Sequence, residues 1–194
     1  LEAIANAPLF AMVSRLTEQK GLHLVLAGVD NVIQGGGQLL VLGSGDAELE
    51  RAFSHSATQY PGRVAVHLGY DEALAHRVFG ASDVTLVPSR FEPCGLTQMY
   101  GLKYGSVPLV RAVGGLVDTV VDADLATLED QSATGVVFQD FTETAYRHAL
   151  RRSFALYHDR RAWARVRRAG MRQPFSWAQA AQQYLTLYQD LIRP

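Results

Sequence analysis

Two positively charged side chains in one short polar run, and a carboxylate in a second, interrupt an otherwise apolar pattern. Arg15 and Lys20 belong to residues 14–21, and Glu92 belongs to residues 88–98. Arginine and lysine form charge-assisted hydrogen bonds with phosphate oxygens, and a carboxylate accepts hydrogen bonds from hydroxyl groups. If folding brings the two runs together, they could neutralise a diphosphate and hold the hydroxyls of a sugar.

The second run also predicts an anion-binding helix end. Pro93 restricts Glu92 to extended backbone, and helical sequence begins near Gly95. The first turn of a helix has backbone N–H groups without intrahelical partners, and the helix dipole adds a partial positive charge there. A helix that starts near Gly95, with Thr97 in its first turn, would therefore attract a phosphate.

The elements around these runs predict where they lie. Apolar segments rich in valine and leucine alternate with segments of helical period. The expected strands are 9–13, 39–42, 64–68, 84–87 and 107–110, and no strand is expected after residue 141. The expected helices are 22–33, 47–60, 72–81, 95–104, 142–157, 159–169 and 177–192. Because the strands of a parallel sheet are covered on both faces, such continuously apolar strands predict a doubly wound α/β fold followed by C-terminal helices.

This fold class indicates one edge of the sheet as the binding site. Ligands of open parallel sheets bind outside the carboxyl ends of the strands, and both polar runs follow a predicted strand. Tyr70 follows the third strand and offers an aromatic face at the same edge. Residues 43–46 follow the second strand with two glycines, which either let backbone approach a ligand or turn the chain tightly.

Other ligand classes fit the sequence less well. Gly43 and Gly45 lack the third glycine of a dinucleotide-binding fingerprint, and no segment matches a P-loop. The six histidines have neither the paired spacing nor the cysteine partners of a zinc site. Asp122 and Asp124 match a two-aspartate metal motif, but the same short pattern also occurs on surfaces and in helix caps.

Composition predicts a single domain over residues 1–194. The chain is 48% hydrophobic, which is enough for one core without staples. Cys94 is the single cysteine and no apolar run is long enough to span a bilayer, so we expect a cytoplasmic protein without disulfides. Since Leu1 precedes the first apolar run by only a few residues, we also expect an excised domain.

The charge is small but unevenly distributed. A net charge of −1 argues against a general nucleic-acid or membrane binder. Residues 141–194 nevertheless carry ten Lys or Arg and three Asp or Glu. Most of these arginines fall in helical sequence, which indicates a solvated or domain-facing helix surface. A polyanion site is the alternative.

Two long segments give the sequence a specific resemblance. The run Ser14-Arg-Leu-Thr-Glu-Gln-Lys-Gly21 and the run Pro88-Ser-Arg-Phe-Glu-Pro-Cys-Gly-Leu96 closely resemble those of bacterial glycogen synthases and plant starch synthases. The likeness continues through Gly115-Leu-Val-Asp-Thr119 and, more loosely, into the helical end. Members of that family have two Rossmann-like domains (the GT-B fold) and transfer glucose from ADP-glucose to an α-1,4-glucan with retention.

The resemblance implies a role for each residue of the two runs. It implies that the chain is the C-terminal, nucleotide-sugar-binding domain, that an N-terminal acceptor domain is absent from it, and that no metal or other cofactor is needed. In this reading the donor diphosphate is bound by Arg15, Lys20, Leu96 and Thr97, the adenine by Tyr70, and the glucose by Glu92 and the backbone of Cys94 and Gly95. Many related transferases have a second glutamate eight positions after the first. Here that position is Tyr100, so ribose recognition stays open.

The mechanism implied by the family agrees with the residues present. A retaining glycosidase needs two carboxylates about 5 Å apart, and only Glu92 is in the right place here. The family mechanism is same-face attack, in which the departing diphosphate takes the acceptor proton. Two alternatives remain open. One is a donor domain that uses UDP-glucose or another acceptor, and the other is a non-catalytic module that binds a nucleotide or a glucan.

Overall fold

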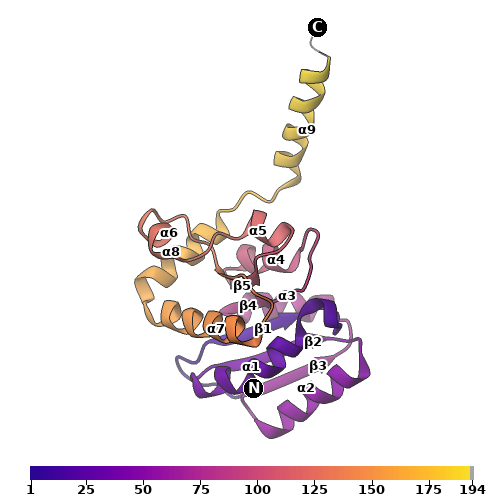
Figure 1. Cartoon of the computed structure of the whole chain (residues 1–194), viewed down its shortest axis with the longest axis vertical. Coiled ribbons are helices and arrows are strands. Elements are labelled where there is room, and N and C mark those ends of the chain that lie inside the picture. The colour runs from indigo at the N-terminus through magenta and orange to yellow at the C-terminus, as the bar shows by residue number, and fades with distance from the viewer. Residues whose placement is uncertain (193–194) are drawn as a thin grey trace.

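The centre of the molecule is a parallel sheet of six strands. The computed structural model describes residues 1–192, and the last two residues of the expected domain, 193–194, lie outside the described part. The strand order is β3-β2-β1-β4-β5-β6, and each neighbouring pair is parallel (Figure 1). The strands are β1 (Leu9–Val13), β2 (Gln38–Gly43), β3 (Val64–Leu68), β4 (Val84–Val87), β5 (Val107–Arg111) and β6 (Val136–Phe138).

Helices cover both faces of this sheet. The helices are α1 (Leu22–Gln34), α2 (Ala47–Gln59), α3 (Glu72–Ala81), α4 (Thr97–Tyr104), α5 (Gly115–Thr119), α6 (Leu125–Glu129), α7 (Glu143–His158), α8 (Arg160–Met171) and α9 (Trp177–Leu191), with a 3₁₀ turn at Glu18–Lys20. Helices α1, α2 and α7 form one layer, and α3, α4 and α8 form the other. The predicted doubly wound α/β fold is confirmed.

The core lies between the sheet and these layers. Strand β4 is buried along its whole length, as expected for a strand covered on both faces. The buried side chains of helix α7 recur at helical spacing, so they form one stripe that packs against the sheet. They are Tyr146, Ala149, Leu150, Ser153, Leu156 and Tyr157. The Tyr146 hydroxyl lies fully inside, where burial raises its pKa.

The structure differs from the expected elements at one strand and one helix start, and it adds the short helices α5 and α6. Val136–Phe138 forms a sixth strand, which pairs with β5 from Leu109 to Arg111. Three residues are too few to show a strand period, so this strand depends on pairing with β5. Helix α4 begins at Thr97, two residues later than predicted, because Gly95 has the left-handed backbone angle φ of 74°.

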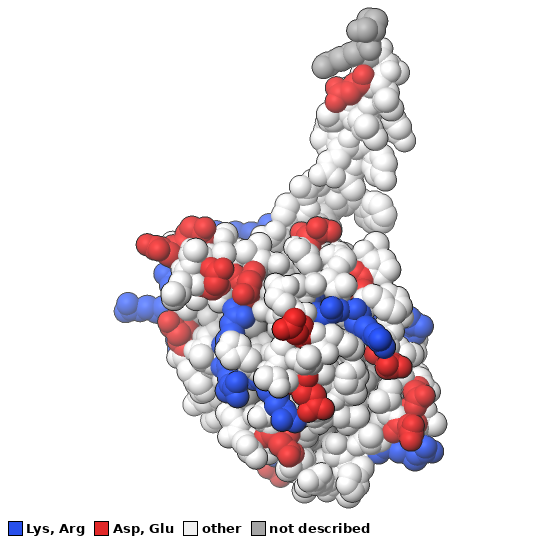
Figure 2. Space-filling view, viewed as in Figure 1, with Lys and Arg blue, Asp and Glu red and all other residues white. Residues whose placement is uncertain are grey.

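The C-terminal helix α9 stands away from the rest of the molecule. Figure 1 shows it projecting beyond the two helical layers, and none of its residues is buried. Its surface in Figure 2 is almost free of charge, whereas acidic and basic side chains are interspersed over the body. Large apolar side chains on α9 are exposed, among them Trp177, Tyr184 and Tyr188. No helix of the described chain has both the length and the apolar character needed to cross a membrane.

Because α9 buries nothing, removing it should leave the stability of the body almost unchanged. A chain that ends at Arg172 should unfold within about 0.5 kcal/mol of the 194-residue chain, the range of changes at exposed positions. Urea denaturation followed by circular dichroism measures this difference. A loss of several kcal/mol would show instead that α9 packs against the body in solution.

Candidate functional site

The two predicted runs lie at the point where the strand order reverses. Strands β2 and β3 lie on one side of β1, and β5 and β6 lie on the far side of β4. The loop after β1 (residues 14–21) and the loop after β4 (residues 88–96) therefore leave neighbouring strands at the same edge. A crevice at such a point is where open α/β sheets bind ligands.

Direct contacts join these two loops. Lys20 Nζ lies 2.6 Å from Glu92 Oε2, and the side chains are only 17% and 10% exposed. The backbone N–H of Arg90 donates to the carbonyl of Gln19 at 2.8 Å, which holds the loops in register. The structure thus brings together the cation and the carboxylate that the sequence placed 72 residues apart.

A third residue, Ser89, also contacts the carboxylate of this ion pair. Ser89 is fully buried, and its hydroxyl donates to Glu92 Oε2 at 3.1 Å. Lys20 and Ser89 therefore share one oxygen of the carboxylate. Sequence reasoning did not select Ser89, although a polar residue at the end of a fully buried strand was a usable signal.

Two glycines allow the backbone to pack this closely. Gly114 has φ of 49°, and a Cβ there would lie 2.0 Å from the carbonyl oxygen of Glu92. Gly21 has φ of 71°, and a Cβ there would lie 2.0 Å from the carbonyl oxygen of Pro88. No side chain fits at either position, so the loops after β1 and β5 press directly on the loop after β4.

Hydrogen bonds from the Gln98 side chain hold the turn before α4. This side chain is fully buried, and its Nε2 donates to the carbonyls of Gly95 at 2.9 Å and Cys94 at 3.3 Å. No side chain caps α4 at Leu96, so its first-turn N–H groups stay available to an anion. Gln98 is a second residue that sequence reasoning did not select.

The remaining residues of this turn face outward. Cys94 is a free, exposed thiol, and Leu96 is 61% exposed. Thr97 is half-buried as the first residue of α4. An exposed turn that ends in an uncapped helix is open to a ligand on the solvent side.

A hollow of about 270 Å³ lies at the same edge of the sheet. It is lined by residues that follow β1, β2 and β3, including Arg15, Ser44, Tyr70 and Asp71. Tyr70 is 88% exposed. The Arg15 guanidinium forms no ion pair with any of residues 1–192, so its charge is free to meet a ligand.

The predicted site residues thus fall into two neighbouring parts of one edge. Arg15 and Tyr70 line the hollow, whereas Lys20 and Glu92 lie at the ion pair and do not line it. Arg15 and Lys20 belong to the same loop, which connects the two parts. The second-strand turn also packs onto this loop, because the Leu16 N–H donates to the Ser44 carbonyl at 2.9 Å.

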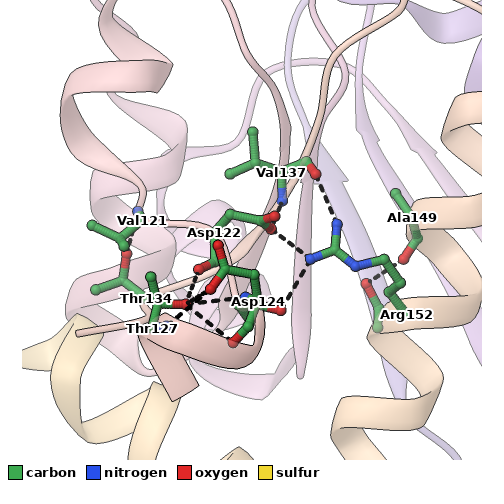
Figure 3. Close-up of polar contacts among 10 residues, drawn as sticks. Val121, Asp122, Asp124, Thr127, Thr134, Val137, Ala149 and Arg152 are labelled. Carbon is green, nitrogen blue, oxygen red and sulfur yellow. Dashed lines mark hydrogen bonds and ion pairs between the residues drawn. The ribbon is translucent and has the colours of Figure 1, made fainter. Parts of the chain in front are cut away.

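The two aspartates of the possible metal motif have structural partners instead. Figure 3 shows Asp122 between the Arg152 guanidinium, at 2.8 Å, and the backbone N–H of Val137 in β6, at 2.7 Å. Asp124 forms a capping box with Thr127 at the start of α6, and the hydrogen bond from the Thr127 N–H lowers the pKa of its carboxyl. The helix-capping interpretation is therefore correct for Asp124.

The structure also shows the surroundings of the histidines and of Tyr100. Within residues 1–192 no group of three or more His, Cys, Asp or Glu side chains is arranged to hold a metal ion.

Tyr100 is 43% exposed on α4 and stacks on Phe79, with ring centroids 5.7 Å apart. Its ring also meets His76 edge-on. Tyr100 therefore belongs to an aromatic cluster between α3 and α4.

Comparison with known proteins gives relatives that match nearly the whole chain. The chain is 59% identical over 187 residues to a glycogen synthase of Variovorax paradoxus and 52% identical over 197 residues to one of Haemophilus influenzae. These matches include 96% and 98% of this chain but 38% and 41% of the relatives. The chain thus spans about two fifths of the length of the curated relatives it matches.

A solved structure and a family profile agree with these relatives. The catalytic domain of starch synthase IV from Arabidopsis thaliana, bound to ADP and acarbose, superposes with a TM-score of 0.88 at 39% identity. That match covers 98% of this chain and 39% of the starch synthase chain. The profile of the family "Glycosyl transferases group 1" matches residues 2–168. The resemblance to glycogen and starch synthases is confirmed, and the chain belongs to the glycosyl transferases group 1 family.

Proposed function

We propose that this chain is the donor-binding domain of a retaining glucosyltransferase that transfers glucose from ADP-glucose to an α-1,4-glucan. The observation that carries the proposal is the largely buried Lys20–Glu92 pair at the strand-order reversal, at the same sheet edge as a hollow with a free arginine and an exposed tyrosine. This arrangement offers cations for a diphosphate, a carboxylate for sugar hydroxyls and an aromatic face for a base.

The diphosphate is assigned to the loop after β1 and to the start of α4. An ammonium group has three N–H donors, so the bond from Lys20 to Glu92 leaves two for phosphate oxygens. The Arg15 guanidinium and the uncapped N–H groups at Leu96 and Thr97 add further donors. The positive charge of Lys20 is thereby held at the boundary between the phosphate and the sugar.

The adenine and the glucose, at the two ends of the donor, are assigned to residues on either side of the diphosphate. The adenine lies against Tyr70 in the hollow, whose position across β1 to β3 suits a nucleoside. The glucose lies at Glu92 and at the backbone of Cys94 and Gly95, which Gln98 holds in place. The starch synthase that superposes on this chain contains ADP, which supports the nucleotide assignment.

In this mechanism the protein acts mainly on the leaving group. As the bond from the glucose C1 to the diphosphate oxygen breaks, negative charge grows on that oxygen, and preorganised cations stabilise it most. Arg15, Lys20 and the α4 end supply that positive charge. The departing oxygen takes the proton of the acceptor hydroxyl, which attacks C1 from the same face, so configuration is retained without a second carboxylate.

The acceptor is assigned to a second, N-terminal domain outside this chain. The relatives named glycogen synthase are more than twice as long as the chain, which supports a further domain. The relatives named glycogen synthase support glycogen, an α-1,4-glucan, as the acceptor, and a cytoplasmic location is part of the same proposal.

Competitive calorimetry with two donors tests this assignment. ADP-glucose should bind more tightly than UDP-glucose, because the hollow at Tyr70 accommodates a purine. Tighter binding of UDP-glucose would favour a transferase of the same architecture with a different donor. If a nucleotide binds but the full-length enzyme extends no glucan, the chain is a binding module.

Cys94 allows the glucose end of the site to be monitored. Iodoacetamide should modify this exposed thiol in the free chain, and ADP-glucose at ten times its Kd should slow the reaction roughly tenfold by occupying the turn. The label reports on one position because the chain has a single cysteine. An alkylation rate that ADP-glucose does not change would place the glucose elsewhere.

A further inference from the structure

The Glu92 carboxylate is held asymmetrically. Both hydrogen bonds that the structure records at this group reach Oε2, from Lys20 at 2.6 Å and from Ser89 at 3.1 Å. A carboxylate has two oxygens and accepts about four hydrogen bonds. The contacts therefore leave Oε1 as the oxygen that can accept from a ligand.

Ser89 is built to fix this orientation. It is the second residue after β4, it is fully buried, and it follows Pro88, whose carbonyl packs against Gly21. Its hydroxyl therefore rests on the rigid end of a central strand. Lys20, by contrast, is 17% exposed at the end of a long side chain and has two further N–H groups for other partners.

We propose that Ser89 is a positioning residue that fixes Oε2 of Glu92, so that Oε1 accepts a hydrogen bond from a hydroxyl of the donor sugar. The inference rests on the proposed function, because it takes Glu92 as the residue that meets the glucose. Ser89 itself touches neither the sugar nor the phosphates. It acts through Glu92 by removing the freedom of the carboxylate to rotate.

This role has a signature that a simple packing role lacks. ADP contains the nucleoside and the diphosphate but no glucose. A disordered Glu92 should therefore weaken ADP-glucose binding and leave ADP binding unchanged. A general defect of the loop would weaken both ligands together, because the loop after β4 adjoins the diphosphate as well.

The test uses Ser89→Ala in the 194-residue chain with ADP and ADP-glucose titrated by calorimetry. Ser153→Ala is the matched control, because Ser153 is 1% exposed and donates only to a carbonyl of its own helix. Ser89→Ala should weaken ADP-glucose binding on the order of tenfold, the effect of one hydrogen bond to a charged group, with ADP affinity within about twofold. Thermal melts test whether both variants are folded. Should Ser89→Ala not fold, Ser89→Cys keeps the volume with a much weaker donor and should show the same selective loss.

Glu92→Gln then separates the inference from the proposed function. In the Glu92→Gln background, adding Ser89→Ala should cause no further loss of ADP-glucose affinity, because the carboxylate it orients is gone. Equal losses for ADP and ADP-glucose, no difference from Ser153→Ala, or additive losses in the double variant would overturn the role of Ser89 while the donor site stands. If the unmodified chain binds neither ligand, the proposed function fails and this inference with it.

Discussion

Lys20→Ala should weaken ADP binding by about 1.5 to 3 kcal/mol, or roughly 10- to 150-fold, the range for charge-assisted contacts. Glu92 holds the Lys20 ammonium group at 2.6 Å, so its position at the proposed phosphate site is set before the ligand arrives. Calorimetric titration of ADP measures the change. Lys103→Ala is the control, because Lys103 is exposed on α4 and away from the loops. Equal losses at both positions would contradict the assignment of Lys20 to the diphosphate.

The same substitution should also destabilise the fold. Glu92 would keep a buried carboxylate without its cation, and breaking a buried pair from one side costs about 3 to 5 kcal/mol. Since Lys20 keeps some contact with water, we expect the lower end of this range. The double variant Lys20→Ala, Glu92→Gln should regain most of this stability without regaining ADP affinity. Denaturation curves and ADP titrations of the same samples therefore separate the two roles of Lys20.

The second large effect that we expect is the absence of glucose transfer by the 194-residue chain alone. We expect the 194-residue chain to bind ADP-glucose and to transfer no glucose to glycogen. Transfer needs an acceptor hydroxyl aligned with C1 in a closed cleft, and effective molarities of about 10⁵ M or more depend on that alignment. In the proposed function, the described part of the chain supplies the donor edge of such a cleft. Without the opposite wall of the cleft, water reaches the donor sugar and the acceptor hydroxyl is not aligned with C1.

Incubation with radiolabelled ADP-glucose and glycogen measures this activity. No label should enter the glucan above the level of a Glu92→Ala variant of the same chain. The full-length enzyme, assayed in parallel, provides the positive control. Glucan extension by the 194-residue chain that depends on Glu92 would contradict the assignment of the acceptor to a second domain.

The sheet and its binding edge could be predicted from the sequence because both depend on local signals. Strand β4 is buried on both faces, so its four residues are all apolar or nearly so, and the loop after it stands out as polar. Strand β6 is also apolar, but its run is only three residues long. Its three residues are a strand only because β5 offers an unpaired edge, and that edge is a property of the tertiary structure.

The candidate site likewise divides into residues that the sequence could select and contacts that only the tertiary structure shows. Arg15, Lys20 and Glu92 could be selected from their charge and their place after predicted strands. That Lys20 and Ser89 share one oxygen of Glu92 could not. The Lys20–Glu92 contact spans 72 positions and depends on the register of two strands, and the Ser89–Glu92 contact depends on how the loop after β4 folds. Likewise, Asp122 reads as a possible metal ligand in the sequence, and only the packing of α7 brings Arg152 to it.

The most direct test of the donor site is calorimetric titration of ADP into the purified 194-residue chain. We expect saturable binding of one ADP per chain at concentrations below a few millimolar, weaker than in the full-length enzyme, where the proposed second domain would add contacts. Binding should weaken with Lys20→Ala and should be unaffected by Lys103→Ala. No detectable heat of binding at millimolar ADP, from a chain shown to be folded by its thermal melt, would contradict the assignment of the nucleotide to this edge of the sheet.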